Sequence, residues 1–185
     1  SAAVQNTSRQ IGMAGGDARD RYPVLYLLHG LSDDHTIWLR RTSIERYAAA
    51  KNLVVIMPAV GRSFYQDMAS GAKYWTFLSE ELPAMCKQWF PLSTGREDTF
   101  AAGLSMGGYG ALRLGMGLPG KFAAVASLSG ALDVGRRCRE AGREGSRLSR
   151  AEMEAMFGAD LNAEGTSADL WQLARELASN RESVP

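Results

Sequence analysis

The sequence predicts a doubly wound α/β fold, in which a mostly parallel sheet is covered by helices on both faces. Four short apolar runs have the continuous hydrophobic pattern of strands that are buried on both sides. Segments with helical spacing separate these runs, and such alternation is typical of a parallel sheet. A chain of 185 residues can bury one sizeable core, so residues 1–185 are expected to form a single domain.

The first quarter of the chain supplies one strand and one helix. Residues 1–22 are polar and glycine-rich, which predicts an irregular lead-in. The apolar run over 24–28 predicts a strand that His29 and Gly30 end, and a polar loop is expected over 31–41. Residues 42–45 have the spacing of a capping box, which predicts a helix from about Ser43 to Lys51.

A second strand is predicted over 53–57, where Pro58 ends another apolar run. A long loop is expected from 59 to about 74. Helical spacing of apolar residues then predicts a helix over 75–89. Pro83 lies inside this pattern and should either kink the helix or mark a restarted first turn.

The second half of the chain begins with a strand predicted over 99–103, a helix over 107–116 and a strand over 122–128. From 131 to 180 the pattern changes to short helices, which predicts a small helical insert after the fourth strand. A capping box at 149–152 starts one of these helices. An apolar stripe marks another: Leu170, Leu173, Ala174 and Leu177.

Composition narrows the choice of partners and compartment. The formal charge of +1 gives no reason to expect nucleic acid or an anionic membrane as partner. No apolar run approaches the roughly 18 residues of a membrane span. Cys86 and Cys138 are expected to be unpaired thiols, which favours the cytoplasm, although a signal peptide before Ser1 could have been removed. The chain has no cluster of metal ligands and no phosphate-binding loop, so no metal or cofactor is expected.

One motif carries chemistry. Residues 103–107 read Gly-Leu-Ser-Met-Gly between a predicted strand and a predicted helix. This is the context of the nucleophile elbow of α/β-hydrolases, in which a tight turn raises the serine hydroxyl above the sheet edge. Gly103 and Gly107 would allow strand and helix to approach closely. An incidental serine in a glycine-rich turn is the alternative, but the flanking elements favour Ser105 as a nucleophile.

A second motif, His29-Gly30-Leu31, directly follows the first predicted strand. Loops at the carboxyl ends of parallel strands converge on one edge of a doubly wound sheet. The backbone N–H of Leu31 could therefore face that of Met106, and two such donors make an oxyanion hole. The simpler alternative is that His29 and Gly30 only end a strand.

These motifs, taken together, resemble the esterase D group of α/β-hydrolases, which includes tributyrin esterases, S-formylglutathione hydrolases and feruloyl-type esterases. The resembling segments are YPVLYLLHG at 22–30, WLRRTSIER at 38–46, EELP at 80–83 and GLSMGGYGA at 103–111. The resemblance implies hydrolysis of short-chain acyl esters by a serine–histidine–aspartate triad without a cofactor. It places the nucleophile at Ser105 and the oxyanion donors at Leu31 and Met106.

The chain departs from the group in its triad. The fold orders its triad as serine, acid and histidine, but the two histidines here, His29 and His35, both precede Ser105. Candidate acids lie in the insert, before the strand that would carry the acid: Asp133, Asp160 and Asp169. The expectation is therefore that strands at both ends, the acid and the histidine lie outside this chain. His35 could alternatively serve as the base, remain solvated, or line the acyl pocket.

Further features leave alternatives open. His35, Trp38 and Tyr65 are candidates for the wall of a substrate pocket, although aromatic rings also fill gaps between loops and sheet. Residues 134–150 hold six arginines against two glutamates, read as a solvated loop rather than a patch for an acidic ligand. The expected partner is a small-molecule ester, and a homo-oligomer stays open. Acyl transfer of the mycolyltransferase kind, or a binding module without catalysis, are the competing functions.

Overall fold

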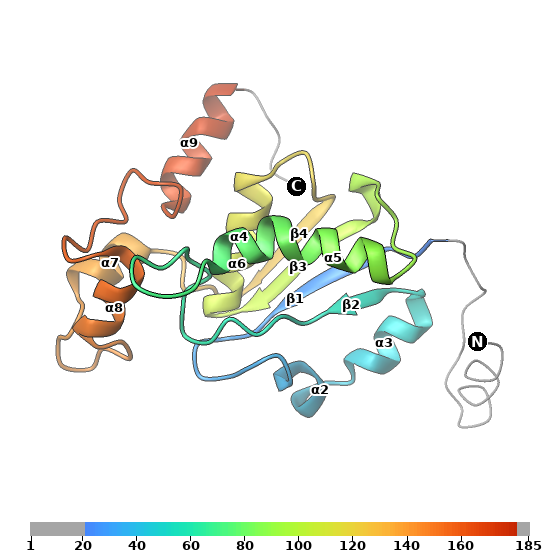
Figure 1. The fold of residues 1–185 in the computed structure, drawn as a ribbon, viewed down its shortest axis with the longest axis horizontal. Coiled ribbons are helices and arrows are strands. Elements are labelled where there is room, and N and C mark those ends of the chain that lie inside the picture. The colour runs from blue at the N-terminus through green and yellow to red at the C-terminus, as the bar shows by residue number, and fades with distance from the viewer. Residues whose placement is uncertain (1–20, 181–185) are drawn as a thin grey trace.

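The computed structural model describes residues 21–180, and a four-stranded parallel sheet forms its centre (Figure 1). The strands are β1 (Val24–Leu28), β2 (Val54–Ile56), β3 (Thr99–Leu104) and β4 (Ala124–Leu128). Their order in the sheet is β2-β1-β3-β4, and all three pairings are parallel. The predicted α/β class is therefore confirmed, with each strand within two residues of its expected bounds. The predicted lead-in over 1–22 lies almost entirely outside the described residues.

Helices connect and cover these strands. They are α2 (Ile37–Arg41), α3 (Ile44–Lys51), α4 (Tyr74–Thr76), the π-helix η1 (Phe77–Glu81), α5 (Leu82–Trp89), the 3-10 helix η2 (Arg96–Asp98), α6 (Met106–Gly117), α7 (Val134–Arg139), α8 (Arg150–Phe157) and α9 (Leu170–Asn180). No helix within residues 21–180 combines the length and the apolar character needed to cross a bilayer.

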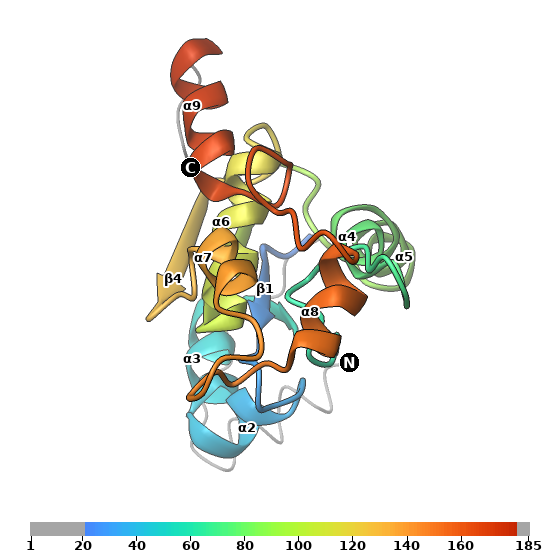
Figure 2. The same cartoon turned by 90° about the vertical axis from the view of Figure 1, so that its left-hand side faces the viewer.

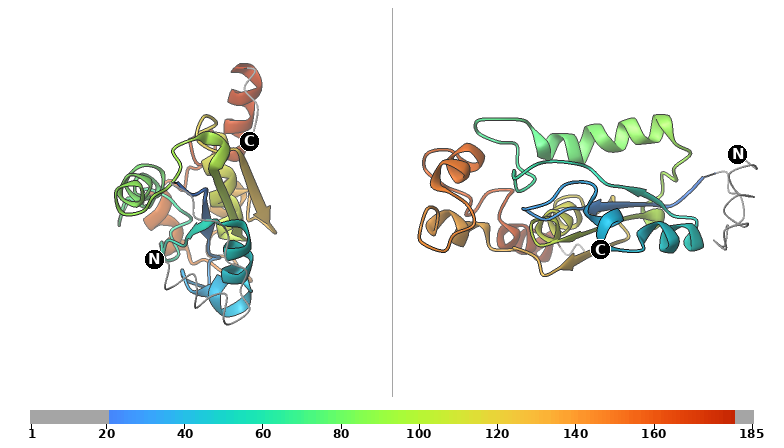
Figure 3. Two further views of the ribbon diagram at one scale, coloured as in Figure 1. Left: turned by 90° about the vertical axis from the view of Figure 1, so that its right-hand side faces the viewer. Right: turned by 90° about the horizontal axis from the view of Figure 1, so that it is seen from below.

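The two faces of the sheet are covered by different helices. Helices α5 and α6 pack on the face of β1 that carries Val24, Tyr26 and Leu28, all of which are buried. The chain crosses from β1 to β2, through α3, in one direction along the sheet. It crosses from β2 to β3 and from β3 to β4, through α5 and α6, in the other direction. Because parallel crossovers are right-handed, α3 covers the other face. The insert helices α7 and α8 lie together at one end of the sheet (Figure 1). Figure 2 views the molecule from that end, and the right-hand view of Figure 3 shows the same grouping from below.

The loop expected over 31–41 contains a helix, α2, and the capping box expected at 42–45 does not form. Helix α3 begins after Ser43 without a side-chain cap. The hydroxyl of Thr42 instead donates to the carbonyl of Trp38, at the end of α2. The same hydroxyl accepts from the N–H of Ile44, the first residue of α3, so Thr42 serves the end of one helix and the start of the next.

The segment around Pro83 is a run of three consecutive helical elements, and Pro83 lies in the first turn of the last one, as the second of the two predicted alternatives has it. Helix α4 passes into the π-helix η1, and α5 follows with Pro83 in its first turn. Proline has no N–H to donate, so the usual hydrogen bond four residues back cannot form at this position. A π-turn widens the helix just before that point and accommodates the missing donor.

The helical insert forms as predicted, and it adds one element that was expected to be loop. Ser149 and Glu152 make the predicted capping box at the start of α8, with both reciprocal hydrogen bonds present. Leu170, Leu173 and Leu177 are buried on α9 as the stripe predicts. Residues 134–139, expected to be part of a solvated loop, form α7. The insert lies beyond the carboxyl ends of the strands (Figure 1).

Candidate active site

Ser105 occupies the turn between β3 and α6. Its backbone angles are φ 56° and ψ −112°, a conformation that side-chain-bearing residues rarely adopt. Such strain persists only where the surroundings enforce it, and it is the conformation expected at a nucleophile elbow. The side chain is only partly buried. The local geometry at Ser105 therefore matches the turn that the sequence motif predicts.

Two glycines make this turn sterically feasible. A Cβ atom added to Gly103 would lie 2.2 Å from the carbonyl oxygen of Gly107. One added to Gly107 would lie 2.3 Å from the carbonyl oxygen of Leu28. In both cases the neighbour is backbone, which cannot rotate away. The α6 helix therefore contacts β1 and β3 at distances that only glycine permits.

Backbone hydrogen bonds fix Ser105 to the adjacent strand and to the start of the insert. The Ser105 N–H donates to the carbonyl of Leu128 at 2.9 Å, and the Ser105 carbonyl accepts from the N–H of Ala131 at 3.0 Å. Tyr109 N–H donates to the same carbonyl at 3.1 Å. The end of β4 thus holds the elbow in place.

The loop after β1 passes beside the elbow. A Cβ atom on Gly30 would lie 3.4 Å from the carbonyl oxygen of Leu104 and 3.8 Å from the Cβ of Ser105. Leu31 follows in this loop, and Met106 is the first residue of α6, so its N–H has no carbonyl four residues back to bind. Neither the Leu31 nor the Met106 N–H donates to any backbone carbonyl within residues 21–180. Both donors predicted for an oxyanion hole are therefore available.

His29 holds this loop from inside the protein. Its Nε2 accepts from the N–H of Val60 at 3.1 Å, so Nδ1 carries the proton and donates to the carbonyl of Gly30 at 2.8 Å. The Tyr65 hydroxyl donates to the carbonyl of His29 at 2.9 Å. His29 and Tyr65 are fully buried. Both ring nitrogens of His29 are thus engaged in joining the loops after β1 and β2, a role that sequence reasoning did not identify.

Burial lowers the pKa of His29, because removal from water disfavours the charged imidazolium. The unfolded chain therefore binds this proton more readily, so the stability due to neutral His29 is complete above its unfolded pKa. It is lost as the pH falls through the folded-state pKa. We expect the free energy of unfolding to decrease from pH 7 to pH 5, by at most about 1.4 kcal/mol per pH unit from this one proton.

Urea denaturation across this pH range measures the effect. His29→Gln should flatten the pH dependence, whatever its cost in absolute stability. His35→Gln is the comparison variant, because that side chain is exposed and has the smallest of the effects on the pKa of His29, so its loss should change the slope much less. An equal slope in the wild type and His29→Gln would assign the acid sensitivity to other groups.

The three candidates for a pocket wall are placed differently. His35 is exposed on the loop before α2. Trp38 is half-buried, and its Nε1 donates to the carbonyl of Leu28 at 3.2 Å, at the end of β1. Tyr65 has no exposed surface, and its hydroxyl donates to the carbonyl of His29 in the loop after β1. Of the three, only Trp38 is both held by a hydrogen bond at the end of β1, the strand next to β3, and partly exposed.

Triad partners for Ser105 are not found within residues 21–180. Neither His29 nor His35 has a hydrogen bond to Ser105 in this part of the chain. Asp133 accepts from the N–H of Arg136 at 2.7 Å and caps α7, and Asp169 accepts from Trp171 N–H at 2.9 Å at the start of α9. These carboxylates serve local helix ends. Within residues 21–180, no group of three or more His, Cys, Asp or Glu side chains is placed so that it could bind a metal ion.

A buried arginine, Arg113, holds the elbow helix α6 to two other segments, and no local sequence pattern predicts it. Arg113 lies on α6, two turns after Ser105, and is 3% exposed. Its Nη1 donates to the carbonyl of Tyr65 and to Gln66 Oε1, both at 2.8 Å, and its Nε donates to the Ser167 carbonyl at 3.1 Å. Arg113 thus ties α6 to the loop after β2 and to the segment before α9.

Comparison with known proteins gives one consistent result. The chain is 33% identical over 164 residues to an acetyl esterase of Caldicellulosiruptor saccharolyticus, which covers 87% of this chain and 61% of that protein. The structure superimposes on the fluorophosphonate-binding serine hydrolase FphF of Staphylococcus aureus with a TM-score of 0.80 and 35% identity, over 93% of this chain and 65% of that one.

The S-formylglutathione hydrolase FrmB of Staphylococcus aureus gives a TM-score of 0.76 and 35% identity, over 91% of this chain and 64% of the other. The chain thus spans 61% to 65% of the length of these three proteins. Residues 9–184 also match the sequence profile of the Esterase family. The resemblance to α/β-hydrolase esterases is therefore confirmed, and this chain belongs to the Esterase family.

Proposed function

We propose that this protein hydrolyses carboxylic esters with short acyl groups, through an acyl-enzyme formed on Ser105. The observation that carries the proposal is the strained turn at Ser105, which lies against the loop that contains Gly30. A nucleophile on such a turn attacks the ester carbonyl and forms a tetrahedral intermediate that bears negative charge on oxygen. The preference for short acyl groups is supported by similarity to an acetyl esterase.

The N–H groups of Leu31 and Met106 are assigned to the oxyanion. Two facts support this assignment: neither donates to a backbone carbonyl within the described residues, and Gly30 lies next to Ser105. The N-terminus of α6 adds the favourable dipole of a helix of 12 residues. Losing one oxyanion donor typically costs about 2.7–4 kcal/mol of transition-state stabilisation. Trp38 is assigned to the wall of the acyl pocket, because it is held at the end of β1 and is partly exposed.

Activation of Ser105 requires a base, since a serine hydroxyl is a weak nucleophile at its ordinary pKa. His29 is excluded from this role by its two hydrogen bonds and its burial. We propose that the histidine and its carboxylate partner are contributed from outside residues 21–180. His35 is the alternative within those residues, and it would have to swing from its exposed loop to reach Ser105.

The test is hydrolysis of p-nitrophenyl esters of increasing acyl length, with products analysed in the presence of an added alcohol. We expect acetate and butyrate esters to be cleaved and longer acyl chains to react more slowly. Water should be the dominant acceptor at every alcohol concentration. Predominant formation of a new ester would instead indicate an acyltransferase, since the two reactions share the acyl-enzyme. Failure to cleave any ester when the histidine and its carboxylate partner are present would favour a binding module built on this fold.

A further inference from the structure

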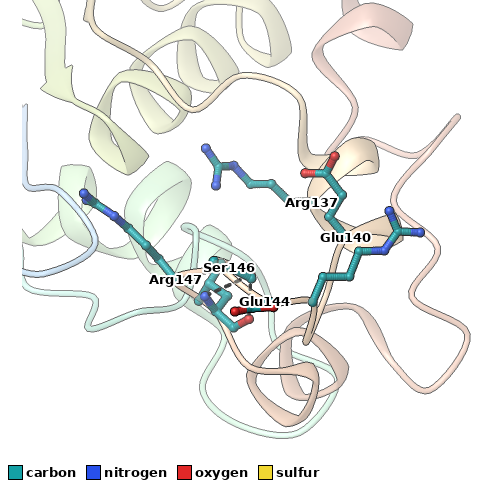
Figure 4. Close-up of a pocket in the computed structure, with 8 residues that line it drawn as sticks. Arg137, Glu140, Glu144, Ser146 and Arg147 are labelled. Atoms are coloured by element: carbon teal, nitrogen blue, oxygen red, sulfur yellow. Dashed lines mark hydrogen bonds between the residues drawn. The ribbon is translucent and has the colours of Figure 1, made fainter.

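A cavity of about 400 Å³ lies within the helical insert, between α7 and the segment that leads into α8 (Figure 4). This volume is within the usual range of small-molecule sites. Three arginines and two glutamates line it: Arg137, Arg143, Arg147, Glu140 and Glu144. The cavity thus gathers most of the arginine-rich segment that the proposed esterase function leaves without a role.

The charges around the cavity are not balanced. Within residues 21–180, no carboxylate forms an ion pair with Arg137, Arg143 or Arg147. Glu140 already pairs with Arg136, at 2.9 Å. Three arginines therefore line the cavity together with one carboxylate, Glu144, that forms no ion pair within the described residues. Most other arginines of the insert do have carboxylate partners, which sets this group of three apart.

Arg137 is held in a partly desolvated position. It is half-buried, and its guanidinium lies 5.5 Å from the ring centroid of Phe64, which is 2% exposed. Burial lowers the pKa of Arg137, and the positive charges of Arg136 and Arg147 lower it further, while the nearby carboxylates of Glu140 and Asp133 raise it. A desolvated cation next to a like charge is unfavourable, and a bound anion would offset that cost.

Arg147 is anchored through its backbone, which leaves its side chain to face the cavity. Its carbonyl accepts from Arg62 Nη2 at 2.7 Å, and Arg62 also pairs with Glu152 of α8 at 2.6 Å. Figure 4 shows the side chains of Arg137 and Arg147 extending toward the same side of the cavity. Each guanidinium group presents a planar fork of N–H donors, which matches the oxygens of a carboxylate or a phosphate.

Packed rings connect the cavity to the elbow. The Phe64 ring, which contacts the guanidinium of Arg137, lies 5.8 Å from the ring of Tyr109, and the Tyr109 N–H donates to the carbonyl of Ser105. Ala131, whose N–H donates to the carbonyl of Ser105, lies three residues before the start of α7. We propose that this cavity binds a carboxylate or phosphate group of the ester on which Ser105 acts, through Arg137 and Arg147. The inference rests on the proposed esterase function and adds to it a substrate class, esters that carry an anionic group.

Two measurements test the inference, and one of them does not require turnover. Isothermal titration calorimetry with succinate and with inorganic phosphate measures anion binding and distinguishes the two chemistries. Kinetics with p-nitrophenyl hemisuccinate and p-nitrophenyl butyrate compare four-carbon acyl chains that differ in a terminal carboxylate. Arg147→Ala should weaken anion binding about 10- to 100-fold, the usual effect of losing a charge-assisted hydrogen bond. It should raise KM for the hemisuccinate by a similar factor and leave the butyrate unchanged.

Arg150→Ala is the matched control, because it removes the same charge from an exposed arginine that pairs with Glu154 away from the cavity. The inference is overturned if neither anion binds, or if both variants weaken binding equally. Cleavage of butyrate with an unchanged hemisuccinate KM in Arg147→Ala would reject the cavity as substrate site and keep the esterase function. Anion binding that depends on Arg147, without cleavage of either ester, would reject the esterase function and keep the anion site.

Discussion

A fluorophosphonate probe is expected to add once, at Ser105, when the proposed histidine and its carboxylate partner are present, and Ser105→Ala is expected to carry no adduct. The probe reacts as an ester would, by attack of an activated hydroxyl on an electrophilic centre whose oxyanion must be stabilised. Ester hydrolysis should fall on the order of a million-fold in the variant, the loss that follows removal of the nucleophile from a serine protease. Intact-mass spectrometry with peptide mapping measures the adduct.

Ser129→Ala is the control for this experiment. Ser129 directly follows β4, is exposed, and shares with Ser105 a positive φ of 48°. Exposure and backbone strain alone would therefore make it equally reactive, whereas the proposal requires the N–H groups near Ser105. An adduct on Ser129, or one that persists in Ser105→Ala, would refute the assignment of the nucleophile. A wild-type protein that takes no adduct would show that this chain does not activate its serine.

The parts of the fold that the sequence predicted are those governed by local rules. The run at 24–28 had to be a strand buried on both faces, because its residues are continuously apolar and a parallel sheet is covered on both sides. The elbow was predictable because Gly103 and Gly107 leave few structures other than a close approach of strand and helix. The capping box at Ser149 was predictable because both of its hydrogen bonds lie within one turn.

The errors and omissions concern contacts between segments far apart in the sequence. For Tyr65 the sequence leaves a pocket wall and a filler between loops and sheet open, because an aromatic ring in a polar loop can face substrate or core; in the structure it is buried and its hydroxyl donates to the carbonyl of His29. The role of His29 depends on the N–H of Val60, 31 residues away. Arg113 was missed because its acceptors come from two other segments. Such partners are defined by the folded chain and leave no local pattern.

Gly107→Ala is expected to destabilise the protein by about 3 kcal/mol or more, although alanine is the better helix former. Within a helix, replacing glycine by alanine ordinarily gains about 1 kcal/mol. Here the added Cβ would lie 2.3 Å from the Leu28 carbonyl oxygen and 2.7 Å from that of His29, so β1 and α6 must separate. Overpacking of this kind costs about 1–3 kcal/mol and more where backbone has to move. Against a total stability of about 5–15 kcal/mol, the loss would be readily measured by urea denaturation.

Gly120→Ala separates the steric effect from the loss of glycine itself. A Cβ atom at Gly120 would have nothing within 4 Å, and its φ is not in the positive range. This variant should be neutral or slightly more stable, by up to about 1 kcal/mol, because alanine restricts the unfolded chain. The loss in Gly107→Ala should also reduce fluorophosphonate labelling of Ser105, since separating α6 from β1 moves Met106 away from Leu31. Equal stabilities for the two variants would mean that the close approach of α6 to β1, and with it the oxyanion geometry proposed for this site, does not exist in solution.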